Sequence, residues 1–233
     1  MQKEPNRLII GKRQAALYPS AEADKPLIVL NEFSGDGRSV VDAMDAIGAP
    51  DCNLLVIGNL NWAHDMTPWY CPPLSENDAP CTGGAVEYLN LLLSEILPKA
   101  RERIRGKPSF VGIAGYSLAG LFALYAMYRC DVFDRVASVS GSLWFPKFSE
   151  YAAEHPLLKR PEKVYLSLGD REANTRNRYL KTVQENTEAI AAYYRDLGLD
   201  VTWELNVGNH FRDAALRCAK GIKAMLESSA EVR

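Results

Sequence analysis

Short apolar runs alternate along this chain with longer amphipathic stretches. The runs have the length of buried strands and lie at residues 27–30, 54–57, 109–114, 135–139, 163–168 and 201–207. Between and after them, helices are predicted near residues 40–47, 86–103, 118–128, 178–197 and 212–227. Uninterrupted apolar runs are typical of parallel strands that are covered on both faces. The alternation therefore predicts an α/β fold, with a mostly parallel central sheet and helices on both faces.

Two segments refine this picture. Residues 8–10 and 14–18 are expected to form an N-terminal hairpin around Gly11 and Lys12. Pro98 falls inside the helix predicted at 86–103 and should kink it, because proline lacks the N–H that the helix needs. No internal repeat interrupts the pattern, so residues 1–233 are predicted to form one domain.

A long segment at residues 59–84 breaks the alternation. It holds four prolines and the aromatic residues Trp62, Trp69 and Tyr70. Irregular segments of this length are uncommon in compact domains and tend to be lids or binding loops, so an active-site loop is predicted. The alternative is a loop whose tryptophans fill a small core of its own. His64 and Asp65 would then either contact a substrate or hold the loop together.

The most informative turn of the chain is Gly115-Tyr116-Ser117-Leu118-Ala119, which joins an apolar strand to an uncharged helix. A serine on a sharp turn between a buried strand and a buried helix is the nucleophile elbow of α/β-hydrolases. Its neighbours must be small, and glycine and alanine meet that need, although glycine is more usual at the fifth position. The alternative is an ordinary strand-to-helix turn with a capping serine.

A serine nucleophile needs a base, since its hydroxyl is inert at neutral pH without one. The chain has three histidines. His155 precedes a proline in what reads as a surface turn, and His64 lies in the long loop upstream of Ser117. His210 follows the last predicted strand and precedes an amphipathic helix, which is where this fold presents its base.

The third member of an α/β-hydrolase catalytic triad, after the serine and the histidine, is a carboxylate, and it should lie between Ser117 and His210 in the chain. The strand predicted at 163–168 runs into a loop that holds Asp170 and Glu172. Many α/β-hydrolases carry the acid three residues after the glycine that ends this strand, a register that falls on Glu172. Asp170 is the alternative. Whichever of the two carboxylates is not the catalytic acid is expected to cap the loop or to pair with a neighbouring arginine.

Together these motifs resemble the esterase family of α/β-hydrolases that includes esterase D and the enterochelin-type siderophore esterases. The resemblance extends from about Pro26 to the last helix and rests on Ala114-Gly115-Tyr116-Ser117, Ser140-Gly141-Ser142-Leu143-Trp144, Gly169-Asp170-Arg171-Glu172 and Gly208-Asn209-His210-Phe211. It implies a metal-independent serine hydrolase that uses no cofactor and acts on small-molecule esters.

The chemistry of such an enzyme sets two further expectations. The negative charge on the carbonyl oxygen needs two backbone donors. One should be the amide of Leu118, and the other should come from the loop after the strand at 27–30, where Phe33 is preferred to Glu32. Substrate contacts are expected from Trp62, Trp69 and Tyr70, because in the family that this chain resembles the corresponding segment lies beside the active site.

Trp144 is a second candidate for the wall of the substrate pocket, and the alternative is that it is a core tryptophan.

Two other functions share the fold. An acyltransferase would use the same triad and deliver the acyl group to an alcohol rather than to water. A non-catalytic binding protein would tend to have lost a triad member, whereas Ser117, Glu172 and His210 are all present.

Composition agrees with an enzyme of this kind. The chain has 233 residues, 47% of them hydrophobic, and a formal charge of −2, which gives no indication of binding to nucleic acid or to an anionic membrane. No apolar core of the signal-peptide kind follows Met1, so a cytoplasmic location is expected. The five cysteines form no C-x-x-C pair and are expected to be reduced, with a bond between Cys71 and Cys81 as the alternative in an oxidising compartment. The oligomeric state is left open.

Overall fold

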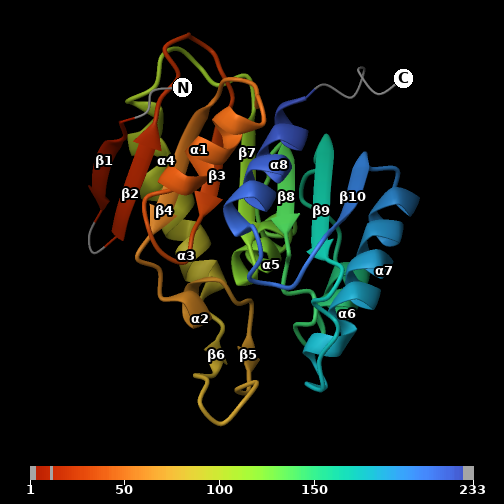
Figure 1. The fold of residues 1–233 in the computed structure, drawn as a ribbon. Coiled ribbons are helices and arrows are strands. Elements are labelled where there is room, and N and C mark those ends of the chain that lie inside the picture. The colour runs from red at the N-terminus through yellow and green to blue at the C-terminus, as the bar shows by residue number, and fades with distance from the viewer. Residues whose placement is uncertain (1–3, 11–12, 228–233) are drawn as a thin grey trace.

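A mostly parallel sheet runs through the centre of the molecule (Figure 1). The computed structural model describes residues 4–10 and 13–227, and within them the sheet has eight strands in the order β1-β2-β4-β3-β7-β8-β9-β10. The strands are β1 (Asn6–Ile10), β2 (Arg13–Tyr18), β3 (Leu27–Asn31), β4 (Asn53–Gly58), β7 (Val111–Tyr116), β8 (Arg135–Val139), β9 (Lys163–Gly169) and β10 (Val201–Asn206). The strands from β4 to β10 in this order are parallel, whereas β1 and β2 are antiparallel at one edge.

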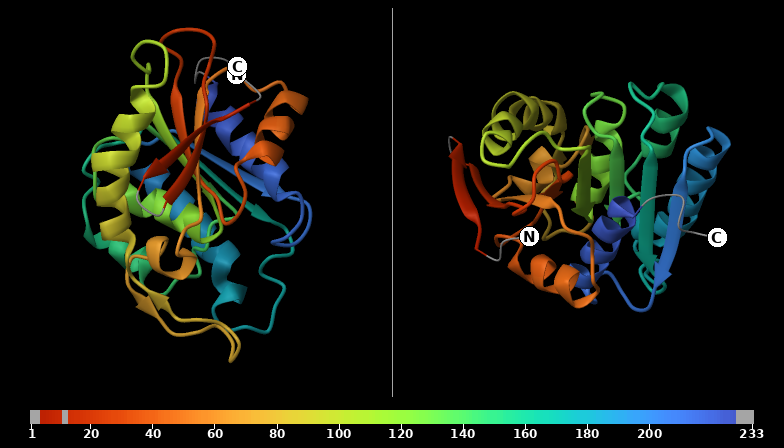
Figure 2. Two further views of the ribbon diagram at one scale, coloured as in Figure 1. Left: turned by 90° about the vertical axis from the view of Figure 1, so that its left-hand side faces the viewer. Right: turned by 90° about the horizontal axis from the view of Figure 1, so that it is seen from above.

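Helices cover both faces of the sheet, as the right-hand view of Figure 2 shows. One face carries α1 (Arg38–Ala46) and α8 (Ala214–Leu226), which pack on one hydrophobic cluster. The other face carries α3 (Ala85–Leu91), α4 (Leu97–Arg101), α5 (Leu118–Ala126), α6 (Phe148–Glu154) and α7 (Val183–Asp196), with a larger cluster beneath them. Every residue of β3, β4 and β9 is buried, which explains their continuous apolar runs. The predicted fold class is confirmed.

The helix predicted at 86–103 is continuous but changes its winding before Pro98. A π-helical stretch, Leu92–Ile96, joins α3 to α4, and Pro98 lies in the first turn of α4. Proline cannot donate to the carbonyl four residues earlier, and a wider turn is one way in which a helix accommodates a break in its ladder. The kink at Pro98 stays a prediction, and what the structure shows is a wider helical turn just before this proline.

Other boundaries differ in detail. The N-terminal hairpin is confirmed by the antiparallel pairing of β1 with β2, while its predicted turn at Gly11 and Lys12 lies outside the described residues. The helix predicted at 178–197 begins as a 3₁₀ turn, Leu180–Thr182, before α7. No helix in the described part of the chain is long and apolar enough to cross a membrane.

The segment at 59–84 is more regular than predicted. It contains a short helix, α2 (Trp62–Asp65), and a small antiparallel pair, β5 (Tyr70–Cys71) and β6 (Cys81–Thr82). Cys71 and Cys81 lie opposite each other in this pair, and neither is in a disulfide. The segment projects from the sheet at the end where the parallel strands finish (Figure 1).

The order of the strands indicates that a ligand binds at the carboxyl ends of the parallel strands. After β3 the chain adds β4 on one side and then crosses to add β7 on the other. Loops at the carboxyl ends of strands that flank such a switch diverge and leave room for a ligand. The loops after β3, β7, β9 and β10 carry Phe33, Ser117, Glu172 and His210 respectively.

Candidate active site

Ser117 occupies a strained turn between β7 and α5. Its backbone has φ 60° and ψ −124°, a conformation that non-glycine residues rarely adopt. The chain can turn this sharply because its neighbours are small. A Cβ atom at Gly115 would lie 2.3 Å from the backbone of Ala119, and one at Gly120 would lie 3.0 Å from Cα of Gly141. Close packing of strand on helix therefore requires these glycines, and it leaves the serine at the tip.

The structure brings Ser117, His210 and Glu172 together. Oγ of Ser117 lies 3.0 Å from Nε2 of His210, and Nδ1 of the same ring lies 2.6 Å from Oε2 of Glu172. With the proton on Nδ1, the ring donates to the carboxylate and Nε2 accepts from the serine hydroxyl. The three side chains thus form an ordered chain of contacts from serine to histidine to carboxylate.

Glu172 is buried and fully hydrogen-bonded. Its second oxygen, Oε1, accepts from the amide of Gly169 at 2.7 Å and from Nη1 of Arg217 at 3.0 Å. Burial alone would raise the pKa of this carboxyl, but hydrogen bonding to His210, the charge of His210 and the Gly169 amide outweigh burial and lower it. The residue is held as a carboxylate.

Asp170 has a different task. Its Oδ1 accepts a hydrogen bond from the amide of Gly208 at 2.8 Å, so it braces the loop that carries His210. Tyr116 steadies the same loop from the other side, since its hydroxyl donates to the carbonyl of His210 at 2.7 Å. The structure thus places Glu172 against the imidazole and Asp170 behind the histidine loop.

Arg217 is a site residue that the sequence reasoning missed. It is only 1% exposed. Besides Glu172, its Nη1 donates to Ser140 Oγ at 3.1 Å and to the Tyr116 hydroxyl at 3.3 Å, and Nη2 donates to the carbonyl of Val207 at 3.1 Å. A signal was available, because Arg217 stands on the otherwise apolar buried face of α8. A charged residue at such a position needs a buried partner.

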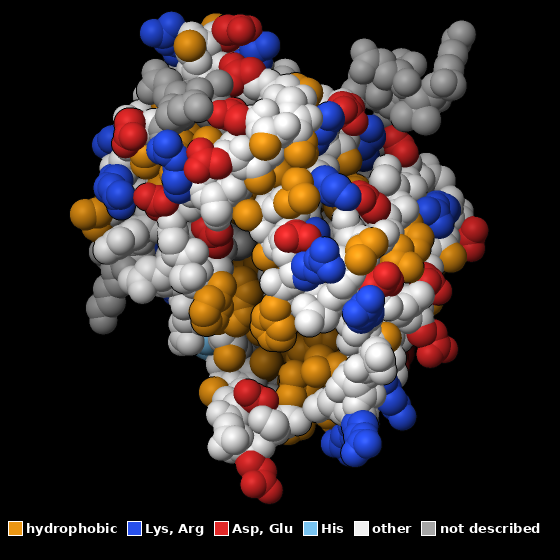
Figure 3. All heavy atoms as spheres, in the orientation of Figure 1, with side chains coloured by type: hydrophobic (Ala, Val, Ile, Leu, Met, Phe, Trp, Pro, Cys, Tyr) orange, Lys and Arg blue, Asp and Glu red, His pale blue; other side chains and the backbone are white. Residues whose placement is uncertain are grey.

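Two cavities meet at Ser117, one of about 450 Å³ and the other of about 660 Å³. Both are lined by Phe33, Trp62, Ser117, His210 and Phe211. Figure 3 shows hydrophobic side chains gathered around a hollow between the β5–β6 pair and the α6–α7 side of the molecule. The side chain of Phe33 contacts Trp62 edge to face, with ring centroids 5.2 Å apart. The approach to Ser117 is therefore largely apolar.

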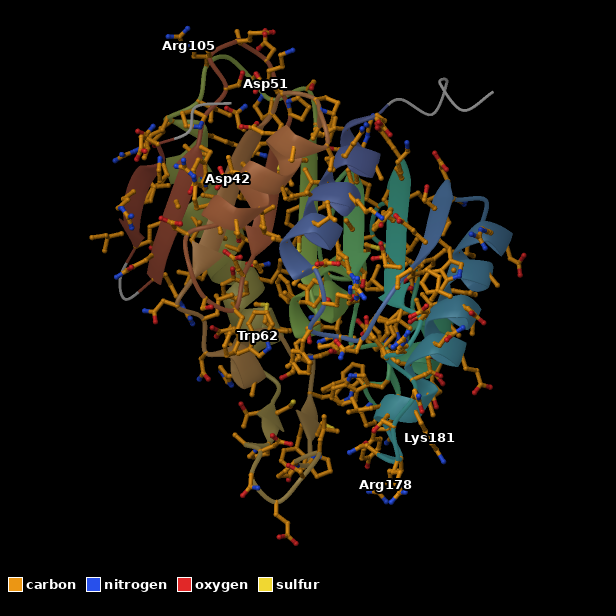
Figure 4. The ribbon with its side chains drawn as sticks, in the orientation of Figure 1. Asp42, Asp51, Trp62, Arg105, Arg178 and Lys181 are labelled. Atoms are coloured by element: carbon orange, nitrogen blue, oxygen red, sulfur yellow. The ribbon has the colours of Figure 1, made fainter. Side chains whose placement is uncertain are left out.

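Of the predicted pocket residues, Trp62 and Trp144 lie in these walls. Trp62 lines both cavities, and Trp144, although buried, lines the larger one. Figure 4 shows Trp62 at α2, close to where the strands end, whereas Arg178 and Lys181 lie at the outer end of the segment before α7.

Trp69 and Tyr70 are not brought into the walls of either cavity. The indole N–H of Trp69 donates to the carbonyl of Pro146 at 2.9 Å, and its ring packs against Phe145 and Tyr151. Tyr70 is exposed on β5. Trp69 thus packs, half-buried, against the main hydrophobic cluster, and not in a small core of the segment's own as the alternative interpretation had it.

The other two histidines are held in structural contacts. Nδ1 of His64 lies 2.7 Å from Oγ1 of Thr82, and neighbouring Asp65 pairs with Arg13 at 2.8 Å, so both residues fasten the segment at 59–84. His155 stacks on a tyrosine of its own helix, α6. Within the described residues, neither histidine lines the two cavities beside Ser117.

Candidate donors for a carbonyl oxygen surround the serine. The amide of Leu118 belongs to the first turn of α5, where N–H groups have no partner within the helix. Phe33 follows β3 closely and lines both cavities. Ser142, from the loop after β8, was not singled out from the sequence; its Oγ lies 3.3 Å from Oγ of Ser117 and its amide donates to the Ser117 carbonyl. No group of three or more potential metal ligands occurs among the described residues.

Comparison with known proteins places the chain in a family. Residues 40–198, more than half of the chain, match the family model described as Putative esterase. The chain belongs to this esterase family. It is therefore a carboxylic ester hydrolase, and the predicted family resemblance is confirmed.

Solved structures support the fold. The chain is similar to the IroE-like serine hydrolase from Shewanella oneidensis, with a TM-score of 0.76 and 20% identity over 94% of this chain and 78% of that one. It is also similar to the siderophore hydrolase EstA from Aspergillus nidulans, with a TM-score of 0.70 and 18% identity over 93% and 91%. A curated relative, the uncharacterized protein YbbA of Bacillus subtilis, is 22% identical over 81% of this chain and 80% of its own length.

Proposed function

We propose that this esterase cleaves its substrate through a covalent acyl-enzyme intermediate on Ser117, with His210 as base and acid and Glu172 as the orienting carboxylate. The observation that carries the proposal is the unbroken chain from Ser117 Oγ to His210 Nε2, and from His210 Nδ1 to Glu172 Oε2. The order in the sequence, serine then acid then histidine, is the order of the α/β-hydrolase triad.

The first half of the reaction transfers the acyl group to the enzyme. Ser117 Oγ attacks the ester carbonyl carbon and its proton moves to His210 Nε2, while the carbonyl π electrons move onto oxygen. As this tetrahedral species collapses, the bond to the leaving alcohol breaks and the alcohol oxygen takes the proton from His210. The product is an ester between the acyl group and Ser117.

The second half restores the serine. Water attacks the acyl carbon, its proton passes to His210 Nε2, and the carbonyl π electrons again move onto oxygen. Collapse breaks the bond to Ser117 Oγ, which recovers the proton from His210, and the acid departs. Glu172 stabilises the imidazolium in both halves and keeps Nδ1 as the protonated nitrogen.

The amides of Leu118 and Phe33 are proposed as the donors to the developing oxyanion. Leu118 offers an N–H at the start of α5, directly after the nucleophile. Phe33 lies on the loop after the neighbouring strand β3 and lines the space around Ser117. Donors from these two loops would meet the carbonyl oxygen from one side while Ser117 attacks the carbon.

The two cavities support an ester with a sizeable group on each side of the scissile bond. Each is of the size of a small-molecule site, and apolar and aromatic side chains such as Phe33, Trp62 and Phe211 stand where they meet. We assign Trp62 and Trp144 to substrate binding, Trp62 at the junction and Trp144 in the larger cavity.

Hydrolysis of 4-nitrophenyl butyrate by three proteins tests the proposal. Ser117→Ala should lose about 10⁴-fold or more in kcat, since it removes the attacking atom. Ser109→Ala is the control, because it makes the same change at an exposed position just before β7 and should leave the activity unchanged. Comparable activity in Ser117→Ala and the wild type would contradict the proposal. Release of butyrate in water and of a butyrate ester in added alcohol distinguishes hydrolysis from acyl transfer.

A further inference from the structure

The smaller cavity contains a carboxyl group for which the reaction above has no use. The cavity extends from Ser117 between the start of α1 and the start of α8. Most of its wall is apolar and comes from Leu30, Val40, Ala214, Ala215 and Cys218. Glu32 lies in the same wall, on the loop between β3 and Phe33.

The position of Glu32 follows from the alternation of β3. Ile28 and Leu30 point into the cluster beneath α1 and α8, and the next residue in that alternation is Glu32. A carboxylate is thus directed toward an apolar helix-covered face. The amide of Gly37 donates a hydrogen bond to it, and the nearby carboxylate of Asp36 adds an unfavourable like charge.

One oxygen of Glu32 is left without a partner. Its Oε2 is buried and accepts no hydrogen bond from any residue that the structure describes. Burial, only partly offset by the Gly37 amide, raises the pKa of this carboxyl to about 7. Leaving a buried acceptor unsatisfied costs about 1–3 kcal/mol.

Glu32 lines the cavity beside Ser117, and its carboxyl group retains an acceptor that no described residue uses, which suits it to binding. Small-molecule sites are mostly apolar and carry a few polar groups that fix orientation. An acceptor in such a wall discriminates strongly, because a ligand that lacks the matching donor leaves the acceptor buried and unpaired. The acceptor on Glu32 therefore indicates that the group which enters the smaller cavity carries a hydrogen-bond donor.

We infer that the smaller cavity binds the half of the ester that carries a hydrogen-bond donor, a hydroxyl or an ammonium group, and that Glu32 accepts from that donor. The inference rests on the proposed function, since it places the scissile carbonyl at Ser117, where the two cavities meet. The substrate class is accordingly a hydroxylated or amino-bearing ester, with its other half in the larger, aromatic-walled cavity.

Two matched series of esters test this inference for either orientation of the substrate. In the acyl series, 4-nitrophenyl esters of heptanoic, 6-hydroxyhexanoic and 6-aminohexanoic acid differ only at the chain end. In the alcohol series, butyrate esters of 1-heptanol, 1,6-hexanediol and 6-aminohexanol differ in the same way. One series should show kcat/KM at least tenfold higher for a donor-bearing ester than for its methyl-ended partner.

Variants at Glu32 assign that preference to its carboxyl group. Glu32→Leu should abolish the preference and leave hydrolysis of the methyl-ended ester and of 4-nitrophenyl acetate largely intact. Glu32→Gln keeps an acceptor without the charge, so it should retain a preference for the hydroxyl and lose one for the ammonium. Glu102→Leu, the same change at an exposed position on the end of α4, is the matched control and should behave as wild type.

The outcomes separate this inference from the proposed function. Equal kcat/KM across both series, or a preference that survives Glu32→Leu, would overturn the inference while ester hydrolysis stands. Failure of the wild type to hydrolyse any of these esters, together with failure of a fluorophosphonate to label Ser117, would overturn both. A third outcome would also overturn the inference. If Glu32→Leu no longer hydrolyses 4-nitrophenyl acetate, Glu32→Gln has normal activity, and neither protein prefers the donor-bearing esters, then Glu32 supports the Phe33 loop instead of binding substrate.

Discussion

Arg217 donates to Glu172 on the oxygen that His210 does not use. The arginine comes from the last helix and the carboxylate from the loop after β9, and their polar atoms are 3.0 Å apart with both side chains almost wholly buried. A buried ion pair of this kind is costly to break from one side, because the remaining charge is left without compensation. The contact fixes the plane of the carboxylate and thereby the orientation of the imidazole.

Replacement of Arg217 should therefore weaken both fold and catalysis. Arg217→Met leaves Glu172 without its cation, and we expect a loss of about 3–5 kcal/mol in the free energy of unfolding. Because an uncompensated buried carboxylate is protonated more easily, the acid limb of the kcat/KM profile should move to higher pH. Arg217→Lys keeps the charge and should restore part of both properties. An unchanged pH profile in a folded Arg217→Met protein would show that the arginine is structural only.

Replacing Glu172 and Asp170, the two carboxylates of the loop after β9, by their amides should lower kcat to different extents. Glu172→Gln is expected to lower kcat about 10⁴-fold, because the amide favours the wrong tautomer of His210. Asp170→Asn preserves an acceptor for the Gly208 amide and should cost far less. Steady-state kinetics on one ester decide which carboxylate is the catalytic acid, and circular dichroism checks that both variants are folded. A larger loss in Asp170→Asn would contradict the assignment of the acid.

The two tryptophans at the ends of the segment 62–69 should respond differently to truncation. Trp62→Ala should lower kcat/KM for large esters much more than for an acetate ester, because binding energy remote from the reacting atoms is lost. Trp69→Ala should instead lower the free energy of unfolding by about 2–4 kcal/mol, with a uniform effect on all esters, since its ring packs into the core. A size-selective loss in Trp69→Ala would contradict this division.

Glu32 should make stability fall as the pH rises from about 4.5 to 7. Its pKa is raised to about 7 in the folded protein, so the unfolded chain loses this proton first and is favoured as the pH passes through that window. The difference of about 2.5 pKa units sets an upper limit of about 3–4 kcal/mol. Glu32→Gln should remove this contribution and flatten the melting temperature between pH 5 and 7. Parallel melting curves for the two proteins would argue against a buried carboxyl at this position.

Much of the fold and the core of the site could be predicted because each depends on a local pattern. Strands buried on both faces need continuous apolar runs, and the elbow at Ser117 needs Gly115 beside it, so both leave a signature in the sequence. The register of Glu172 after Gly169 was likewise readable, and the structure places its carboxylate on His210.

The rest of the site depends on long-range packing. Trp69 and Trp62 are alike in sequence context and both pack, half-buried, against the larger cluster, and only the tertiary structure puts Trp62 beside Ser117. Arg217 lies 45 residues from Glu172 in the chain, and its role could be suspected only from a charge on an apolar helix face. The cavity beside Glu32 forms between helices that are far apart in sequence, so no local pattern indicates it.

The most direct test of the central claim is mass spectrometry of the protein after reaction with a fluorophosphonate. We predict a single adduct on the peptide that contains Ser117, no adduct in Ser117→Ala, and much slower labelling in His210→Ala, because the base that activates the serine is gone. Labelling of the Ser117→Ala protein at the wild-type rate, or an adduct on another residue of the wild type, would contradict it.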